Sequence, residues 1–285
     1  MITDMKKWTT LIAVATLSLG LAACNETAKP AGSGEVTEKS KLTLQEVYDK
    51  SITASEELKS VRAVMDLNQT MNIPSEENEL EISSKMDMEY IVEPMQMHQK
   101  GTSTVNGLAK GMPAQTSSSE SYMTADDLYV YEESAGEWMK FPQEMMAGIM
   151  NAAEQANASD QLKQIKGYLD EFTFEQDNSN YILTLEASGE KFTELVKAQV
   201  DEVMQSMGAG EEIQMDFDIK SVNYLIHIDK ETFQTNKLDV VIDMDMEIDG
   251  EKLNVVQDVK STFSGFNEVE EIVIPQEVID NAVEL

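Results

Sequence analysis

The chain has 285 residues, of which 53 are Asp or Glu and 21 are Lys or Arg, so its formal net charge at pH 7 is −32. A surface this acidic repels nucleic acid and anionic lipid headgroups, which excludes a nucleic-acid-binding protein. Hydrophobic residues make up 41% of the chain, enough for a buried core, and the single cysteine excludes a fold held together by disulfides.

The N-terminal stretch has the layout of a secretory signal peptide. Lys6 and Lys7 precede an apolar run, Leu11 to Leu21, and small residues follow it. The run is too short, at roughly a dozen residues, to span a bilayer as a permanent helix. Cys24 comes directly after Leu-Ala-Ala and resembles the lipobox of bacterial lipoproteins. That resemblance implies cleavage before Cys24, acylation of its thiol with diacylglycerol, and anchorage to the outer face of the cell membrane.

Composition divides the chain into three segments. Residues 1–23 form the predicted lipoprotein signal peptide. Residues 24–41 form the lipidated cysteine and a flexible tether, because they are rich in Gly, Ser, Pro and charge and lack apolar periodicity. No second linker interrupts residues 42–285, which we expect to form a single domain.

The domain opens with a predicted helix, for which Thr43 is the cap and Glu46 completes a capping box. From Val61 the apolar residues alternate with polar ones, which predicts antiparallel strands with one buried face. The Gly/Ser/Thr-rich stretch 101–119 is expected to be a long hairpin loop or a frayed strand pair. Helical spacing then predicts helices over 142–150, 162–169 and 190–207.

Three long strands, over 222–228, 238–248 and 253–263, are predicted to form a C-terminal meander, before a short helix that begins at Pro275 and continues through Val283. In the middle strand apolar residues alternate strictly with acidic ones. A slip of one residue would drive carboxylates into the apolar layer, so the register is firmly set. One face carries Leu238, Val240, Ile242, Met244, Met246 and Ile248, and the other carries Asp239, Asp243, Asp245 and Glu247.

This order of a helix, long strands, a helical insert and a final meander resembles the LolA/LppX-like bacterial lipoprotein carriers, and also an uncharacterised family of surface lipoproteins from Gram-positive bacteria. Residues 122–141 carry most of the resemblance, and residues 228–233 add to it. The resemblance implies an α+β fold in which a strongly curved antiparallel sheet forms a half-open barrel. It also implies that helices cover the concave face, which can hold a lipid, and it brings no catalytic residues.

Methionine is unusually frequent, with nineteen in the chain. Pairs spaced by two residues place both thioethers on one face of a strand, and such flexible side chains suit ligands of irregular shape. Simple packing against the helices is the alternative, and both interpretations stay open. The candidate ligand-binding residues are Met65, Met86, Met88, Met244 and Met246.

Two metal sites were weighed, and we expect neither a metal nor any other cofactor. Met95, Met97 and His98 include the soft ligands that Cu(I) prefers, but residues 97 and 98 point to opposite faces of a strand. The stretch 245–250 begins like a calcium loop, yet its twelfth position is Val256, where a bidentate Glu is needed.

The sequence contains no motif of a hydrolase, a metalloprotease or a phosphate-binding enzyme, and its only histidines are His98 and His227. We therefore expect a non-enzymatic, lipid-anchored, extracytoplasmic lipoprotein that binds or carries an apolar ligand such as a lipid. The alternative is a surface interaction or structural lipoprotein with a packed core and no small-molecule ligand.

Overall fold

The structure is a computed structural model that describes residues 27–32, 36–37, 39–74, 78–109, 111–143, 145–146, 162–163, 166–188, 193, 215–248 and 250–285. The predicted signal peptide, Cys24 and nearly all of the helix predicted over 190–207 lie outside these residues. Within the part that is described, no helix is both long enough and apolar enough to cross a bilayer.

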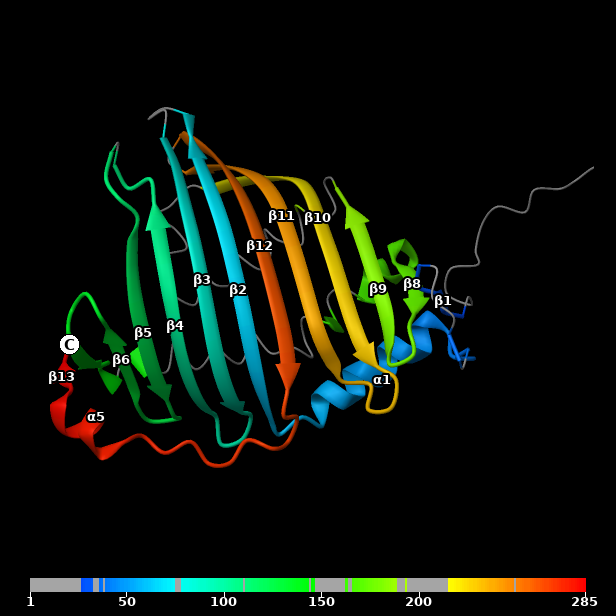
Figure 1. The fold of residues 1–285 in the computed structure, drawn as a ribbon, viewed down its shortest axis with the longest axis horizontal. Helices are drawn as coiled ribbons and strands as arrows, with labels where there is room; N and C mark the ends of the chain where they lie inside the picture. Colours follow the sequence, from blue (N-terminus) through cyan, green and yellow to red (C-terminus); the bar gives the residue numbers. More distant parts are fainter. Residues whose placement is uncertain are drawn as a thin grey trace, which may run out of the picture.

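One large, curved, open sheet dominates the described chain, with few helices around it (Figure 1). Its strand order is β1-β8-β9-β10-β11-β12-β2-β3-β4-β5-β6-β7-β13. The predicted curved antiparallel sheet is therefore confirmed, with two short parallel pairs at its edges, β1 with β8 and β7 with β13. The strands are β1 (Lys29–Pro30), β2 (Ser60–Ile73), β3 (Asn78–Ile91), β4 (Gln96–Asn106), β5 (Gln115–Met123), β6 (Leu128–Glu132), β7 (Glu137–Lys140), β8 (Thr173–Gln176), β9 (Asn180–Ala187), β10 (Met215–Asp229), β11 (Thr235–Ile248), β12 (Glu251–Ser264) and β13 (Val283–Glu284).

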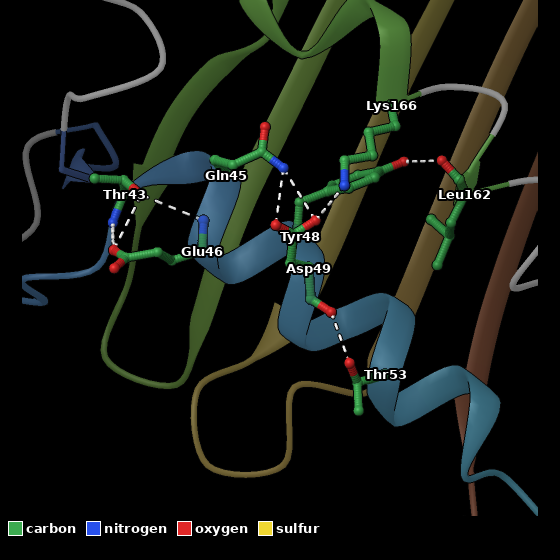
Figure 2. Close-up of polar contacts among 8 residues, drawn as sticks. All are labelled: Thr43, Gln45, Glu46, Tyr48, Asp49, Thr53, Leu162 and Lys166. Atoms are coloured by element: carbon green, nitrogen blue, oxygen red, sulfur yellow. Dashed lines mark hydrogen bonds and ion pairs between the residues drawn. The ribbon is translucent and has the colours of Figure 1, made fainter.

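The first helix, α1 (Leu44–Glu56), begins as the sequence predicts. The Thr43 hydroxyl accepts a hydrogen bond from the Glu46 backbone N–H (3.3 Å), and the Glu46 carboxylate accepts one from the Thr43 N–H (2.8 Å). Figure 2 shows two further contacts, the Tyr48 hydroxyl donating to the Leu162 carbonyl (2.8 Å) and Lys166 paired with Asp49 (2.7 Å). These contacts tie α1 to the segment around the 3₁₀ helix η3 (Lys166–Glu171).

The apolar side of α1 packs on one face of the sheet over β8–β11, and we call this region the packed end. Leu183 and Leu185 are completely buried there, in one cluster with apolar side chains of α1 and of the segment around η3. That helices cover the concave face of the sheet stays a prediction. The buried side chains of the packed end are Leu44, Val47, Tyr48, Ile52, Leu183, Leu185, Ile219, Val222, Ile226 and Ile228.

The predicted facing of β11 is confirmed by its neighbours. Leu238, Ile242 and Met244 pack against the packed end, while Asp245 on the other face forms an ion pair with Lys220 (2.7 Å). The acidic side chains of β11 thus stay out of the apolar layer, as the alternation requires.

Of the two alternatives for residues 101–119, the strand pair is confirmed rather than the loop, because β4 continues to Asn106 and pairs with β5, which starts at Gln115. The predicted end of the last helix is wrong. The last helix, α5, covers only Gln276–Asn281, and Val283 instead pairs with Met139 in a parallel bridge between β13 and β7. A free edge of β7 offered backbone partners that helical spacing alone does not reveal.

The predicted tether is in part bound to the domain. The Gln176 side chain, which is fully buried, donates from Nε2 to the Ala28 carbonyl (2.7 Å) and accepts from the Ser40 N–H (3.2 Å). Ala28 is itself buried, and β1 pairs with β8. A flexible tether over all of 24–41 is therefore wrong for these residues, since Thr27 already bridges to Thr43 of the domain.

Candidate ligand-binding face

The register of β2, β3, β4 and β5 sorts their side chains into two unlike faces. Every charged residue of these four strands lies on one face, namely Arg62, Asp66, Glu79, Glu81, Lys85, Asp87, Glu89, Lys100 and Glu120. The opposite face, which we call the uncharged face, has no charged side chain among the described residues of these strands. It carries Val61, Ala63, Met65, Leu67, Gln69, Met71 and Ile73 of β2, Leu80, Ile82, Ser84, Met86, Met88 and Tyr90 of β3, Met97, Gln99, Gly101, Ser103 and Val105 of β4, and Gln115, Ser117, Ser119, Ser121 and Met123 of β5.

The candidate methionines all lie on this side of the sheet, but in two groups. Met65 stands directly opposite Met86, and Met88 follows two residues along the same strand. Met244 stands opposite Val255, which in turn stands opposite Met71 of β2. Because Met65 and Met71 are six residues apart in one strand, roughly 20 Å separates the two groups.

One member of the second group joins the core cluster of the packed end. Met244 packs against that cluster, and Met246 lies two residues further along β11, opposite Leu253. All five side chains are half-buried, but Met65, Met86 and Met88 lie on the central strands, outside the cluster. The first group is therefore better placed to meet a ligand than the second.

The position of Met86 is set by its neighbours on β4. The Gln99 side-chain amide donates a hydrogen bond to its sulfur (3.3 Å). Gly101 leaves room for the side chain, because a Cβ at this position would lie 3.0 Å from both Met86 Cγ and the Lys85 carbonyl oxygen. Gly101 and the Gln99 amide thus fix the position of the Met86 thioether near the middle of the uncharged face.

Of the three residues considered for copper, Met95 and Met97 lie in one cluster, and His98 lies on the other face of the sheet, as the alternation predicts. Met97 shares the uncharged face with Met123, and buried Met95 and Met146 complete a thioether cluster there. His98 points to the other face, where its Nε2 bonds Glu120 (2.8 Å). No group of three His, Cys, Asp or Glu side chains could hold a metal ion within the described part of the chain.

A polar cavity of about 420 Å³ lies on the charged face, beneath the segment that follows β12. Its floor contains an Arg62–Glu89 ion pair (2.9 Å) and a His98 ring stacked on Tyr122 at 4.3 Å. Residues 268–273 form its rim. Sequence reasoning missed this cavity because no local pattern shows that residues after β12 return to β2–β5.

Glu120 forms hydrogen bonds with two residues that line this cavity, His98 and Tyr122. Burial would raise the pKa of Glu120, but hydrogen bonds from His98, Tyr122 and Lys100 outweigh it and hold that pKa below its ordinary value. Burial and the adjacent carboxylate raise the pKa of Tyr122 to about 12. Near neutral pH the Glu120 carboxylate is therefore ionised and the Tyr122 phenol is protonated, which fits the hydrogen bond that the phenol donates to the carboxylate.

The other histidine, His227, is half-buried on β10 and stands opposite Lys237. Burial, followed by this neighbouring cation, lowers the pKa of His227. Its neutral form is therefore favoured, which fits a cross-strand role in the sheet.

A family model described as a family of unknown function, DUF6612, matches residues 43–283. No curated protein matches the chain. Among solved structures, a DUF1329 family protein from Desulfovibrio piger has 10% identity and a TM-score of 0.23, over 80% of this chain and 95% of that one. A beta-barrel-like DUF1849 protein from Brucella abortus has 10% identity and a TM-score of 0.25, over 73% and 98%.

Proposed function

We propose that this chain, which belongs to DUF6612, a family of unknown function, is a lipid-anchored extracytoplasmic protein. Its uncharged face binds or carries a lipid. In this proposal Cys24 carries the acyl chains, helices cover the concave face of a half-barrel as in LolA/LppX-like carriers, and no reaction is catalysed. The observation that supports it best is that every charged side chain of β2–β5 lies on the opposite face of the sheet.

The size and chemistry of this face suit an acyl chain. A chain that spans half of a bilayer core of about 30 Å needs roughly 15 Å, and the stretch from Met65 to Met71 covers roughly 20 Å. Ten buried methylenes at roughly 0.8 kcal/mol each contribute about 8 kcal/mol, near micromolar binding before losses. A charged side chain on the same surface would cost several kcal/mol to bury against that chain, and none is present in the described residues of β2–β5.

The bound part of the N-terminal segment would bring this domain close to the bilayer. Cys24 precedes Thr27 by three residues (27 − 24), which span at most about 10 Å when extended. Thr27 bridges to Thr43 and Ala28 is held by Gln176. Acylation of Cys24 would therefore place the β1–β8 edge beside the membrane, within reach of its lipids.

Native mass spectrometry of the full chain, purified in a mild detergent, tests the proposal. We expect wild type to retain a co-purifying lipid and Met86→Lys to lose it, because an ammonium would stand where the acyl chain lies. Asp87→Lys is the matched control, since it introduces the same group one residue away on the charged face, where Asp87 is exposed. Wild type without any lipid, or equal retention by both variants, would contradict the proposal.

A surface interaction or structural lipoprotein is the second candidate, and the packing of Met244 favours it. That side chain contacts the packed end, as a plain core residue would. In this case Met86→Lys would lower the melting temperature while wild type bound no lipid at all.

A further inference from the structure

The uncharged face changes character between β3 and β4. On the β2 side its residues are mainly apolar, as at Met65, Leu67 and Met71. On the β4 and β5 side many of them are small or carry a hydroxyl group. Cross-strand pairing places apolar residues of β3 directly beside these polar residues of β4 and β5. The hydroxyl and amide side chains, which we call the hydroxyl strip, are Ser84, Gln99, Ser103, Ser117, Ser119 and Ser121.

One hydroxyl of this strip has no partner among the residues that the structure describes. Ser84 donates to Ser103 (2.9 Å), but the Ser117 hydroxyl, directly opposite Ser103, is buried without a hydrogen-bond partner among the described residues. A buried hydroxyl without a partner is unfavourable, so a ligand hydroxyl that reached Ser117 after its neighbouring side chains moved would be favoured there.

The strip contains no cation that could pair with a phosphate. The only lysine of β4 and β5 is Lys100, which lies on the other face and is paired with Glu120 (3.3 Å). Glu132 of β6, directly opposite Ser119, instead adds a carboxylate at the edge of the strip. A carboxylate accepts hydrogen bonds from ligand hydroxyls and repels an anionic headgroup.

We infer that the uncharged face takes a neutral glycolipid, with its acyl chains over β12, β2 and β3 and its sugar over the hydroxyl strip. This inference rests on the proposed function and names the class of its ligand. Serine hydroxyls and the Gln99 amide both donate and accept hydrogen bonds, which matches the paired donors and acceptors of a sugar. Phospholipids are disfavoured on this surface because their phosphate would meet Glu132, and no described residue of β2–β5 on this face carries a positive charge.

A competition experiment with the full chain tests this ligand class. The detergent-purified protein is mixed with phosphatidylcholine vesicles that contain equal amounts of monoglucosyl diacylglycerol, diacylglycerol and phosphatidylglycerol with identical acyl chains. Bound lipids are then identified by native mass spectrometry. We expect the glucosyl lipid to exceed each of the others about tenfold, which corresponds to one or two net hydrogen bonds.

Serine variants test whether the hydroxyl strip causes the preference for the glucosyl lipid. Ser117→Ala with Ser119→Ala removes two hydroxyls of the strip, so the preference for the glucosyl lipid over diacylglycerol should fall severalfold while diacylglycerol capture stays unchanged. Ser118→Ala is the control, because residue 118 lies between them on the opposite face and should leave the preference intact.

The outcomes separate the two claims. Equal capture of the glucosyl lipid and diacylglycerol, a preference for phosphatidylglycerol, or a preference that survives the double serine variant would overturn the glycolipid inference and leave a lipid-binding protein. Capture of no lipid would overturn the proposed function as well.

Discussion

The packed end and the centre of the sheet have the same alternation of apolar side chains. At the packed end it builds a core, and at the centre it leaves a half-buried surface. At the packed end, Leu183 and Leu185 project from β9 toward α1 and are completely buried. At the centre, Leu67 and Met86 project to the same side of the sheet and stay half-buried. Alternation thus decides which way a side chain points, and the covering element decides whether it is core or contact surface.

The largest expected effect tests whether stability is concentrated at the packed end. Leu183→Ala should cost about 2–5 kcal/mol of unfolding free energy, because it opens a cavity in a fully covered site. Leu67→Ala removes the same atoms from a half-buried site and should cost only roughly 1 kcal/mol. Urea unfolding of both variants measures the difference, and equal losses would remove the distinction between the two regions.

The docked N-terminal segment gives the next largest effect. Gln176→Leu removes the partner of both the Ala28 carbonyl and the Ser40 N–H, and each unpaired group costs about 1–3 kcal/mol when buried. Water can reach the Ser40 side, so we expect a total loss of about 2–3 kcal/mol.

Hydrogen exchange locates this second effect. The Ala31 N–H donates to the Gln176 carbonyl (2.8 Å), a backbone contact that the variant keeps in principle. In Gln176→Leu this amide should exchange faster, whereas amides of β2 should keep the wild-type rate. Unchanged protection at Ala31 would mean that strand pairing alone holds the segment.

A smaller effect is expected at the centre of the sheet. Gly101→Ala places a methyl group 3.0 Å from Met86 Cγ and from a backbone oxygen, so Met86 must move. We expect a loss of about 1 kcal/mol, at the low end for overpacking, together with weaker lipid retention. A variant that retains lipid like wild type would show that the position of Met86 is not part of ligand binding.

The sequence predicted the facing of regular strands better than the irregular register of strands that contain a bulge. Strict alternation along β11 was sufficient to assign both of its faces, because a carboxylate cannot enter the apolar layer. It could not reveal the irregular register of β10, where Ile219 and Val222 are both buried although three residues apart. A bulge between them breaks the period of two, so this strand was predicted to begin only at Val222.

The candidate site was predictable to a similar degree. Spacing by two placed Met86 and Met88 on one face, which the pairing with β2 confirms. It could not tell that Met244 packs against the core cluster of the packed end, because cross-strand register depends on contacts between residues distant in sequence. The same limit explains why Gln176 was not recognised as the partner of Ala28, which precedes it by more than a hundred residues.

The smallest expected effect concerns acid and the charged face. Hydrogen bonds from His98, Tyr122 and Lys100 hold the pKa of Glu120 below its ordinary value of 4.5. A carboxylate with a depressed folded-state pKa stabilises the fold fully above the unfolded value, and the contribution is lost as the pH falls through the folded value. Wild type should therefore lose this stabilisation in a window that begins near pH 4.5 and extends below it.

Glu120→Gln removes the titrating group while keeping an acceptor for the Tyr122 hydroxyl. At pH 7 the variant should be less stable than wild type by under about 1 kcal/mol, because the site is partly solvated and its ion pairs are screened. Thermal melts at pH 7 and pH 3.5 measure this, and the gap between the two proteins should shrink at the lower pH. A gap that stays constant would show that Glu120 contributes by shape alone. A gap that widens would place the pKa of Glu120 above its ordinary value and reverse the sign of its contribution.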